Sequence, residues 1–397
     1  MAEQYQYIII GGGLAGASAV EGIREVDQAG TIALFALEPH LPYDRPPLSK
    51  GLWTGKTKEA DLLVHDDAFY RTNQVRIFRD TRIVRIDRKN KEVQDVPGNA
   101  YGYSRLLIAT GGTPRTLPFG NGILETYRTW ADYKRLRDEA EHRAEFLVIG
   151  GGFIGTELAA ALTMNGKKVT VLIPEEHLLA RILPAGLAQY VLTYCRDKGM
   201  EVATGETVVA TERKEKRVAV TTRSGKRWEA DAAIAAIGIE PGVDIAREAG
   251  LTVNGGIRVS AHLRTSDNAI FAAGDVAVFP SSSLDGRIRI EHWDNARAMG
   301  KQAGRNMAGA NEDYDYLPYF WTDIFDLGCE AVGNLDSRLT TFCDWRDENK
   351  EGVVYYMDGG RVKGVLLWNV WEKVEAARKL IDSRKTFPDP EALRGAI

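Results

Sequence analysis

The sequence is short of cysteine, of net charge and of long apolar runs, and each shortage narrows what the protein can be. Its three cysteines, Cys195, Cys329 and Cys343, are far apart and show no paired spacing. A reactive disulfide or a metal–thiolate site needs thiols close in sequence or an obvious set of histidine partners. We therefore expect three buried thiols, no bound metal, and redox chemistry that resides on a bound cofactor.

The charge balance and the missing apolar runs limit the partners and the location. The formal net charge is -4, with 51 Lys and Arg against 55 Asp and Glu. Nucleic acids attract a basic surface, so we expect no nucleic-acid partner. No apolar run reaches the roughly 18 residues of a membrane span, and residues 1–7 lack the basic segment of a secretory signal. These features predict a cytoplasmic protein without a membrane span.

A glycine-rich pattern is present twice, each time directly after a short apolar run. The letters GGGLAG occupy residues 11–16, and GGGFIG occupies residues 150–155. At such a strand-to-helix turn the first glycine makes the tight turn and the second lets a pyrophosphate approach the backbone. The third lets the helix pack on the strand, with its N-terminus facing the anion. The repeat therefore predicts two dinucleotide sites in one chain.

Each glycine pattern is followed by a second predicted strand that ends near an acid. Gly16 and Glu38 are 22 positions apart (38 − 16), and Gly155 lies 20 or 21 positions before Glu175 or Glu176. An acid about 20 residues beyond the pattern binds the adenosine ribose in such folds. The spacing does not choose between Glu175 and Glu176.

The second site is predicted to prefer NAD(H) to NADP(H). No arginine stands at the end of its second strand, where the extra phosphate of NADP usually needs a cation. The nearby Lys167, Lys168 and Arg181 keep this a preference only.

At 397 residues the chain exceeds one hydrophobic core. An apolar run at 269–273 ends in Gly274 and Asp275, which returns a carboxylate to the first nucleotide, so the first domain is predicted to be discontinuous. The predicted fold is α/β, with two Rossmann-like dinucleotide-binding domains and a small α+β C-terminal domain. The first covers residues 1–120 and 246–313, the second residues 121–245, and the third residues 314–397.

Several local elements follow from pattern and composition. Alternation predicts antiparallel strands at 75–86 and 91–96. A loop without helix is predicted at 39–50 from Pro42, Pro46 and Pro47. Near the C-terminus, strands at 353–357 and 362–368 flank Asp-Gly-Gly, which predicts a hairpin, and a helix is expected at 371–383.

Five motifs, in the right order, resemble a known group of enzymes. They are LPYDRPPLSK at 41–50, GFIGTE at 152–157, AGD at 273–275, EHWDNA at 291–296 and FWTD at 320–323. The chain resembles, over essentially its whole length, the FAD-dependent NAD(P)H oxidoreductases with the architecture of glutathione reductase. The branch is that of the ferredoxin and rubredoxin reductases and the apoptosis-inducing factor family. Residues 344–351 lack the long polar insertion of animal apoptosis-inducing factors, so their cell-death role is not carried over.

The resemblance implies an FAD site and an NAD(H) site. The FAD residues lie on the first glycine loop, on later loops and before the helix at 293: Gly11, Gly13, Leu14, Ala15, Gly16, Glu38, Arg45, Lys50, Ile83, Ala109, Thr110, Gly111, Arg128, Gly274, Asp275, Glu291, His292 and Trp293. The NAD(H) residues are Gly150, Gly152, Phe153, Ile154, Glu175 or Glu176, and Gly238.

The same resemblance assigns five catalytic residues. Lys50 and Glu157 would form an ion pair at the flavin edge, where a cation favours the reduced flavin. The ring of Phe153 would cover the nicotinamide side, with plain core packing as the alternative. His292 is expected near the flavin or nicotinamide, or is a structural histidine, and Trp321 is expected near the flavin or in the core.

The implied function is electron transfer from NADH to FAD and then to an external acceptor. The loop that contains Lys50 holds the place of the reactive cysteines of disulfide reductases, and it contains no cysteine. A ferredoxin or rubredoxin, that is, a small iron–sulfur protein, is the expected acceptor. The alternatives are a redox sensor or assembly factor with a long-lived reduced-flavin·NAD complex, and an NADH oxidase or quinone reductase. Association into a homodimer is left open.

Overall fold

The computed structural model describes residues 2–397, which form two compact units. Unit 1 consists of Met1–Asp44, Ala60–Thr113 and Pro241–Pro318, and unit 2 consists of Arg45–Glu59, Pro114–Glu240 and Tyr319–Ile397. Each unit contains one of the two glycine patterns. The C-terminal sheet belongs to the same unit as the second pattern, and so does the short segment 45–59. Our functional division into three domains stays a prediction.

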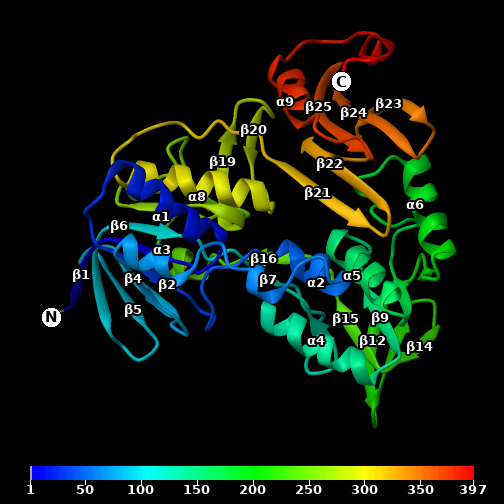
Figure 1. The fold of residues 1–397 in the computed structure, drawn as a ribbon, viewed down its shortest axis with the longest axis horizontal. Helices are drawn as coiled ribbons and strands as arrows, with labels where there is room; N and C mark the ends of the chain where they lie inside the picture. Colours follow the sequence, from blue (N-terminus) through cyan, green and yellow to red (C-terminus); the bar gives the residue numbers. More distant parts are fainter. Residues whose placement is uncertain (1) are drawn as a thin grey trace. The chain divides into compact units, whose positions relative to one another are not determined.

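Unit 1 is built on a seven-stranded sheet (Figure 1). The central strands pair in parallel and are buried, as expected where helices or loops cover both faces. The strands are β1 (Glu3–Ile10), β2 (Ile32–Phe35), β3 (Val75–Phe78), β4 (Ile83–Asp87), β5 (Glu92–Asp95), β6 (Ala100–Ile108) and β18 (Ile270–Ala272). Since β18 pairs with β6, the chain returns to this sheet after residue 240, as the Gly-Asp motif predicted.

Two helices, α1 (Leu14–Val26) and α8 (Trp293–Met307), lie side by side in unit 1 (Figure 1). Glycines allow their backbones to touch: a Cβ added to Gly300 would lie 2.3 Å from the carbonyl oxygen of Ala15. One added to Gly304 would lie 2.1 Å from that of Ala19. This close packing fixes the start of α8 against the first glycine loop.

One prediction for unit 1 is wrong. Residues 75–78 do not form an antiparallel strand; they form β3, which pairs in parallel with β2, with Val75 opposite Ile32. Only β4 and β5 form the antiparallel pair. Alternation shows which face of a strand is buried, but it carries no information about strand direction. The smaller elements are α3 (Asp67–Thr72), α7 (Asp244–Glu248), η3 (Gly274–Val276), β17 (Ile257–Arg258), β19 (Ala277–Ser281) and β20 (Gly286–Ile288).

Unit 2 contains a second parallel sheet, in the order β11-β10-β9-β15-β8. Its strand order reverses beside β9, which is where ligands bind in open α/β sheets. The strands are β8 (Glu125–Thr126), β9 (Glu145–Ile149), β10 (Lys168–Leu172), β11 (Glu201–Ala203) and β15 (Ala232–Ala235). Helices α4 (Trp130–His142), α5 (Phe153–Met164) and α6 (Ala185–Asp197) and the antiparallel strands β12 (Val208–Lys214), β13 (Arg217–Thr222) and β14 (Arg227–Ala230) complete this part.

The segment 45–59 begins with a short 3₁₀ helix, η1 (Pro46–Ser49), followed by α2 (Gly51–Thr54). The predicted helix-free loop therefore contains one helical turn, because proline is tolerated at the first positions of a helix. Short elements η2 (Glu59–Asp61), β7 (Gly112–Pro114) and β16 (Ile239–Pro241) lie where the chain passes from one unit to the other.

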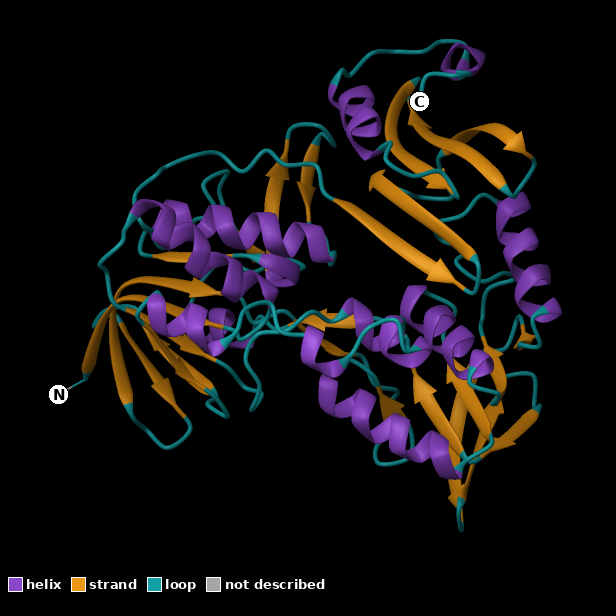
Figure 2. Cartoon of the chain, in the orientation of Figure 1, coloured by secondary structure: helices purple, strands orange, loops and turns teal. Residues whose placement is uncertain are grey.

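The C-terminal part of unit 2 is an antiparallel sheet in the order β21-β22-β25-β24-β23, with α9 packed on β22 and β25 (Figure 2). Its elements are β21 (Tyr319–Ile324), β22 (Leu327–Gly333), β23 (Thr340–Asp347), β24 (Glu351–Asp358), β25 (Arg361–Trp368), α9 (Val374–Asp382) and η4 (Pro390–Leu393). The predicted hairpin is confirmed as β24–β25, whereas the helix begins at Val374 rather than at 371. Within residues 2–397, no helix combines the length and apolar character that crossing a bilayer requires.

Candidate functional site

The loop after β1 has the backbone geometry that a bound pyrophosphate needs. Gly11 has a φ of 133°, and a Cβ there would lie 2.0 Å from the carbonyl oxygen of Ala109. A Cβ on Gly16 would lie 2.1 Å from that of Gly11. A Cβ on Gly13, by contrast, would meet no atom within 4 Å, and no side chain caps the N-terminus of α1. Open space and uncapped N–H groups at this turn fit the phosphates of FAD.

The loop after β9 repeats this geometry. Gly150 has a φ of 113°, and its Cβ would lie 2.4 Å from the carbonyl oxygen of Ala236. Gly155 approaches the carbonyl oxygen of Gly150 in the same way, at 2.1 Å. Gly152 faces open space, and α5 has no side-chain cap. This turn therefore fits the phosphates of a second dinucleotide.

Most of the predicted FAD residues of unit 1 follow the carboxyl ends of four neighbouring strands. Glu38 comes after β2, residues 11–16 after β1, residues 109–111 after β6, and residues 274–275 after β18. The carboxyl ends of parallel strands share one edge of a sheet, so these residues gather there. Ile83, at the start of β4, is buried.

Two side chains at this edge have fixed partners within unit 1. The Tyr43 hydroxyl donates to Oε2 of Glu38 at 2.6 Å, and Oγ1 of Thr110 donates to the carbonyl oxygen of Gly242 at 2.7 Å. Tyr43 was not predicted as a site residue, although it lies in the motif at 41–50. By holding the Glu38 carboxylate, it orients the predicted ribose acid.

The start of α8 brings Glu291, His292 and Trp293 into unit 1. Nε1 of Trp293 donates to Oδ1 of Asp44 at 2.5 Å. Burial raises the pKa of Asp44, and this hydrogen bond opposes the rise. Burial lowers the pKa of His292 to about 4, against the attraction of Asp275, so its imidazole is neutral at neutral pH.

Arg289 is a further unpredicted contact at this place. Its Nη1 donates to the carbonyl oxygen of Asp275 at 2.9 Å and to Oε1 of Glu291 at 2.5 Å. One guanidinium thus ties the loop after β18 to the segment before α8, which stiffens both predicted cofactor segments.

In unit 2 the expected ion pair of Lys50 and Glu157 is present. Nζ of Lys50 lies 3.1 Å from Oε1 of Glu157, and the side chains are 15% and 4% exposed. Nζ also donates to the carbonyl oxygen of Trp321 at 3.3 Å and lies 5.4 Å from the centre of its ring. Asp323 adds a longer contact of 3.7 Å from an exposed position. The lysine is therefore held from several sides.

Two hydroxyl groups that the sequence did not single out complete the environment of Glu157. Oγ of Ser49 donates to Oε2 and Oγ1 of Thr322 donates to Oε1, each at 2.6 Å. Burial raises the pKa of the Glu157 carboxyl above its ordinary value, while Lys50 and the two hydroxyls oppose that rise. The charge of Glu157 thus depends on a balance of large effects.

Phe153 and Trp321 are not core residues. Both are half-buried, and the Phe153 ring contacts the edge of Phe320, with 4.9 Å between centroids. Ile154, next to Phe153 on α5, is 44% exposed. A half-exposed ring at the start of α5 and another on β21 are open to contact with a ligand, and the roles of Phe153 and Trp321 stay predictions.

The remaining predicted residues of unit 2 surround the second glycine loop or hold segment 45–59. Glu175 accepts from Arg181 at 3.0 Å, whereas Glu176 is exposed; both follow β10. The carbonyl oxygen of Gly238 accepts from the backbone N–H of Arg115 at 2.9 Å. Arg45 donates to the carbonyl oxygen of Arg128 at 2.7 Å. The choice between Glu175 and Glu176 stays open.

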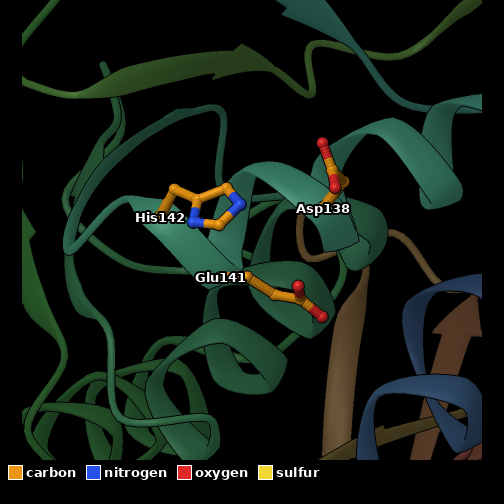
Figure 3. A group of neighbouring side chains, drawn as sticks. All are labelled: Asp138, Glu141 and His142. Carbon is orange, nitrogen blue, oxygen red and sulfur yellow. The ribbon is translucent and has the colours of Figure 1, made fainter.

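The three thiols and one exposed group on α4 lie outside the set of predicted site residues. The three cysteines are unpaired, and burial raises the pKa of Cys195 and of Cys329 to about 12. On α4, Asp138, Glu141 and His142 each offer one ligand atom within 4.8 Å of the others (Figure 3). All three are exposed, and nearby carboxylates are common on a solvated helix face, so we assign no metal there.

Comparison with known proteins gives consistent matches along the chain. Residues 5–300 match the family described as pyridine nucleotide-disulphide oxidoreductase, and residues 319–395 match the family described as reductase C-terminal. Apoptosis-inducing factor 1, mitochondrial, of Dictyostelium discoideum is 35% identical, over 100% of this chain and 81% of the relative. The ferredoxin–NAD(+) reductase component of the anthranilate 1,2-dioxygenase system of Burkholderia cepacia is 34% identical, over 98% and 96%.

The fold also matches a solved structure closely. Putidaredoxin reductase, in its covalent complex with putidaredoxin, superposes with a TM-score of 0.90 at 30% identity. The match covers 96% of this chain and 93% of that chain.

Proposed function

Since this chain belongs to the pyridine nucleotide-disulphide oxidoreductase family, we propose that it carries electrons from NADH through bound FAD to an external acceptor. Its branch is that of the FAD-dependent ferredoxin and rubredoxin reductases and the apoptosis-inducing factors. The observation that carries the proposal is the duplicated turn: Gly13 and Gly152 both face open space at an uncapped helix start. Bound FAD supplies the chemistry of accepting a hydride and releasing electrons.

In this proposal, residues of the chain bind and orient the two nucleotides and place charges beside them. Residues 11–16 and 150–155 hold the two pyrophosphates, and Glu38 holds a ribose. Lys50 provides a cation beside the flavin, and Glu157 keeps that cation in place. Phe153 shields the nicotinamide side until NADH enters. NADH is preferred because Arg181, the nearest arginine in sequence to the ribose acids, is paired with Glu175.

We propose that a small iron–sulfur protein accepts the electrons. Relatives of this chain are a ferredoxin–NAD(+) reductase component, a putidaredoxin reductase and a rubredoxin-NAD(+) reductase. The unpaired thiols support an external acceptor, because the high pKa of Cys195 and Cys329 keeps them as unreactive thiols. Unpaired cysteines are also typical of reducing compartments, so we propose a cytoplasmic location.

A second candidate function is favoured by one comparison. The apoptosis-inducing factor of Dictyostelium discoideum is as similar to this chain as the ferredoxin reductase of Burkholderia cepacia, at 35% and 34% identity. The alternative is a redox sensor that holds its nucleotides and turns over slowly. Slow turnover with every acceptor, together with NADH-dependent dimerisation on size exclusion, would favour it.

The test of the main proposal starts from the purified chain. We expect bound flavin in the absorbance spectrum, faster bleaching by NADH than by NADPH, and fast steady-state turnover with a ferredoxin or rubredoxin. Oxygen, quinone and ferricyanide serve as comparison acceptors. The absence of flavin, or equal rates with both nucleotides, would contradict the proposal.

Two matched variants separate the sites. Ala is sterically allowed at Gly13 and Gly152, because each lies at negative φ and faces open space. We expect Gly13→Ala to lower flavin content, and Gly152→Ala to keep the flavin but raise the KM for NADH at least about tenfold, the cost of a displaced phosphate contact. The reverse pattern would exchange the two assignments.

A further inference from the structure

Three consecutive residues of β21 each contact one of the residues predicted to act in hydride transfer. All of these contacts lie within unit 2, and they join Phe320 to Phe153, Trp321 to Lys50, and Thr322 to Glu157. Strand β21 comes from the C-terminal sheet, which contains neither glycine loop. The sheet therefore supplies one wall of the Lys50–Glu157 environment.

Thr322 makes the contact with the greatest chemical consequence. An ionised carboxylate only accepts hydrogen bonds, so the single hydroxyl hydrogen of Thr322 must point at Oε1 of Glu157. Lys50 Nζ approaches the same oxygen, while Ser49 donates to Oε2. The two oxygens are thus held from different sides, which fixes the rotation of the carboxylate about its terminal bond.

The position of Thr322 is itself rigid. The side chain is 2% exposed, and its backbone pairs with Cys329 in the β21–β22 ladder. Its β-branched side chain restricts χ1. Because Glu157 is only 5% exposed, water cannot easily replace a lost hydroxyl.

We propose that Thr322 is a positioning residue, whose hydrogen bond keeps Glu157 ionised and turned toward Lys50. The C-terminal sheet then sets the charge state of the pair, in addition to any part it has in acceptor binding. This inference rests on the proposed function, in which Lys50 acts beside bound FAD. The inference is argued from the C-terminal sheet, whereas the proposed function is argued from the two glycine loops, so the inference can fail while the proposed function stands.

The test compares Thr322→Val with Thr322→Ser in the flavin-loaded protein. Val keeps the shape and removes the donor, and Ser restores the donor. For Thr322→Val we expect flavin reduction by NADH at pH 7 to slow about tenfold, the effect of one lost charge-assisted hydrogen bond. The midpoint of the pH–rate profile should move upward, and the midpoint potential of the flavin should change. Thr322→Ser should return all three toward wild type.

An infrared spectrum provides a readout that is independent of turnover. Thr322→Val should show a protonated-carboxyl band near neutral pH that disappears when Glu157→Gln is added. If Thr322→Val does not fold, Thr322→Ala and Ser49→Ala take its place, each removing one donor. An unchanged pH profile, potential and infrared spectrum in a folded variant would overturn the proposal.

Thr222→Val is the matched control. Thr222 is also 2% exposed and donates to a buried glutamate, Glu206, at 2.7 Å, in a part of unit 2 that contains no predicted site residue. The Thr222→Val variant should leave the pH–rate profile and the midpoint potential of the flavin unchanged. A wild-type protein without flavin, or not reduced by NADH, would defeat the proposed function. A normal wild type with a silent Thr322→Val defeats only this inference.

Discussion

Glu206 and Glu157, both in unit 2, accept hydrogen bonds from the same three kinds of side chain. At Glu206 the donors are Lys226 at 2.8 Å and Thr222 and Ser224 at 2.7 Å. At Glu157 they are again one lysine, one threonine and one serine, at 3.1, 2.6 and 2.6 Å. The donor sets match, so any difference between the two carboxyls comes from where the clusters lie.

The two carboxyls differ in the direction of their pKa shifts. Hydrogen bonds from Lys226 first, and then from the two hydroxyls, lower the pKa of Glu206 to about 2. For Glu157 burial outweighs the same donors and raises the pKa. The lysines show why: the side chain of Lys226 is 67% exposed, whereas that of Lys50 is 15% exposed. The two glutamate side chains are almost equally covered, at 5% and 4% exposed, so the clusters differ in their lysines: the same kinds of donor stabilise a carboxylate whose lysine reaches water, yet only partly offset burial where the lysine is covered as well.

The clusters also differ in how the chain assembles them. The donors to Glu206 lie within 20 residues of it, on and beside one hairpin. Ser49 and Thr322 lie 108 and 165 residues from Glu157. The Glu206 cluster joins residues on and beside one hairpin, whereas the Glu157 cluster requires three separate segments of unit 2.

The largest expected difference comes from removing each lysine. Lys50→Met leaves a buried carboxylate without its counter-charge, which costs about 3–5 kcal/mol when the charge stays. We expect it to abolish fast flavin reduction in stopped-flow measurements. The side chain of Lys226 is 67% exposed, so water screens its charge and can replace it, and Lys226→Met should leave reduction unchanged. If the two variants changed stability and flavin reduction equally, the proposed difference between the two clusters would be wrong.

The pH dependence of stability should have opposite signs at the two glutamates. The folded pKa of Glu206, about 2, lies below its ordinary value of 4.5, so its stabilisation is present above pH 4.5 and is lost as the pH falls toward 2. The folded pKa of Glu157 is raised, so its contribution is lost as the pH rises from 4.5 through that pKa.

Urea unfolding of two glutamine variants between about pH 2.5 and pH 8 measures these signs, because the Glu206 contribution changes below pH 4.5 and the Glu157 contribution above it. Relative to wild type, Glu206→Gln should become less stable as the pH rises, and Glu157→Gln should become more stable. Parallel pH curves for the two variants would show that burial does not separate the clusters.

The two lysine–glutamate pairs should also differ in how salt changes their coupling energies, although this effect is smaller. At 1 M salt the screening length is about 3 Å, so an exposed pair weakens while a buried pair changes little. Double-mutant cycles should give a Glu206–Lys226 coupling that falls with salt. The Glu157–Lys50 coupling should stay nearly constant. If salt lowered both coupling energies, the Glu157–Lys50 pair would not be shielded from solvent as proposed.

The smallest expected difference is between the two serines. Ser224 is exposed and water can replace it, so Ser224→Ala should change stability by less than about 0.5 kcal/mol. Ser49 is 3% exposed, and Ser49→Ala should cost about 1–3 kcal/mol, because it leaves an oxygen of Glu157 unpartnered. Thermal unfolding of both variants measures this, and equal melting temperatures would contradict it.

The glycine loops and their strands could be predicted from the sequence because their physics is local. Gly11 and Gly150 are required by positive φ and by a carbonyl oxygen only 2.0 and 2.4 Å from where a Cβ would lie, and such needs appear as a spacing pattern. The Lys50–Glu157 pair came only from resemblance, since no rule of spacing joins residues so far apart. The direction of β3 was missed because alternation is the same in parallel and antiparallel edge strands.

The sequence analysis did not assign a role to the hydroxyl donors, although Ser49 lies in the motif at 41–50 and Thr322 in the motif at 320–323. Ser49 and Thr322 are ordinary polar residues, and only tertiary folding places them within 2.6 Å of one carboxylate. Asp44 and Arg289 were missed for the same reason. Side chains that act on another side chain leave no periodic signal in the sequence.

The position of Thr322 near the end of the chain has a consequence during protein synthesis. On the ribosome, both glycine loops, Lys50 and Glu157 emerge before β21 does. A nascent chain of that length contains the residues of both glycine loops, but Glu157 still lacks its threonine donor. Completion of the Glu157 environment is thus tied to the synthesis of β21, so a truncated product that ends before residue 319 would lack the threonine donor.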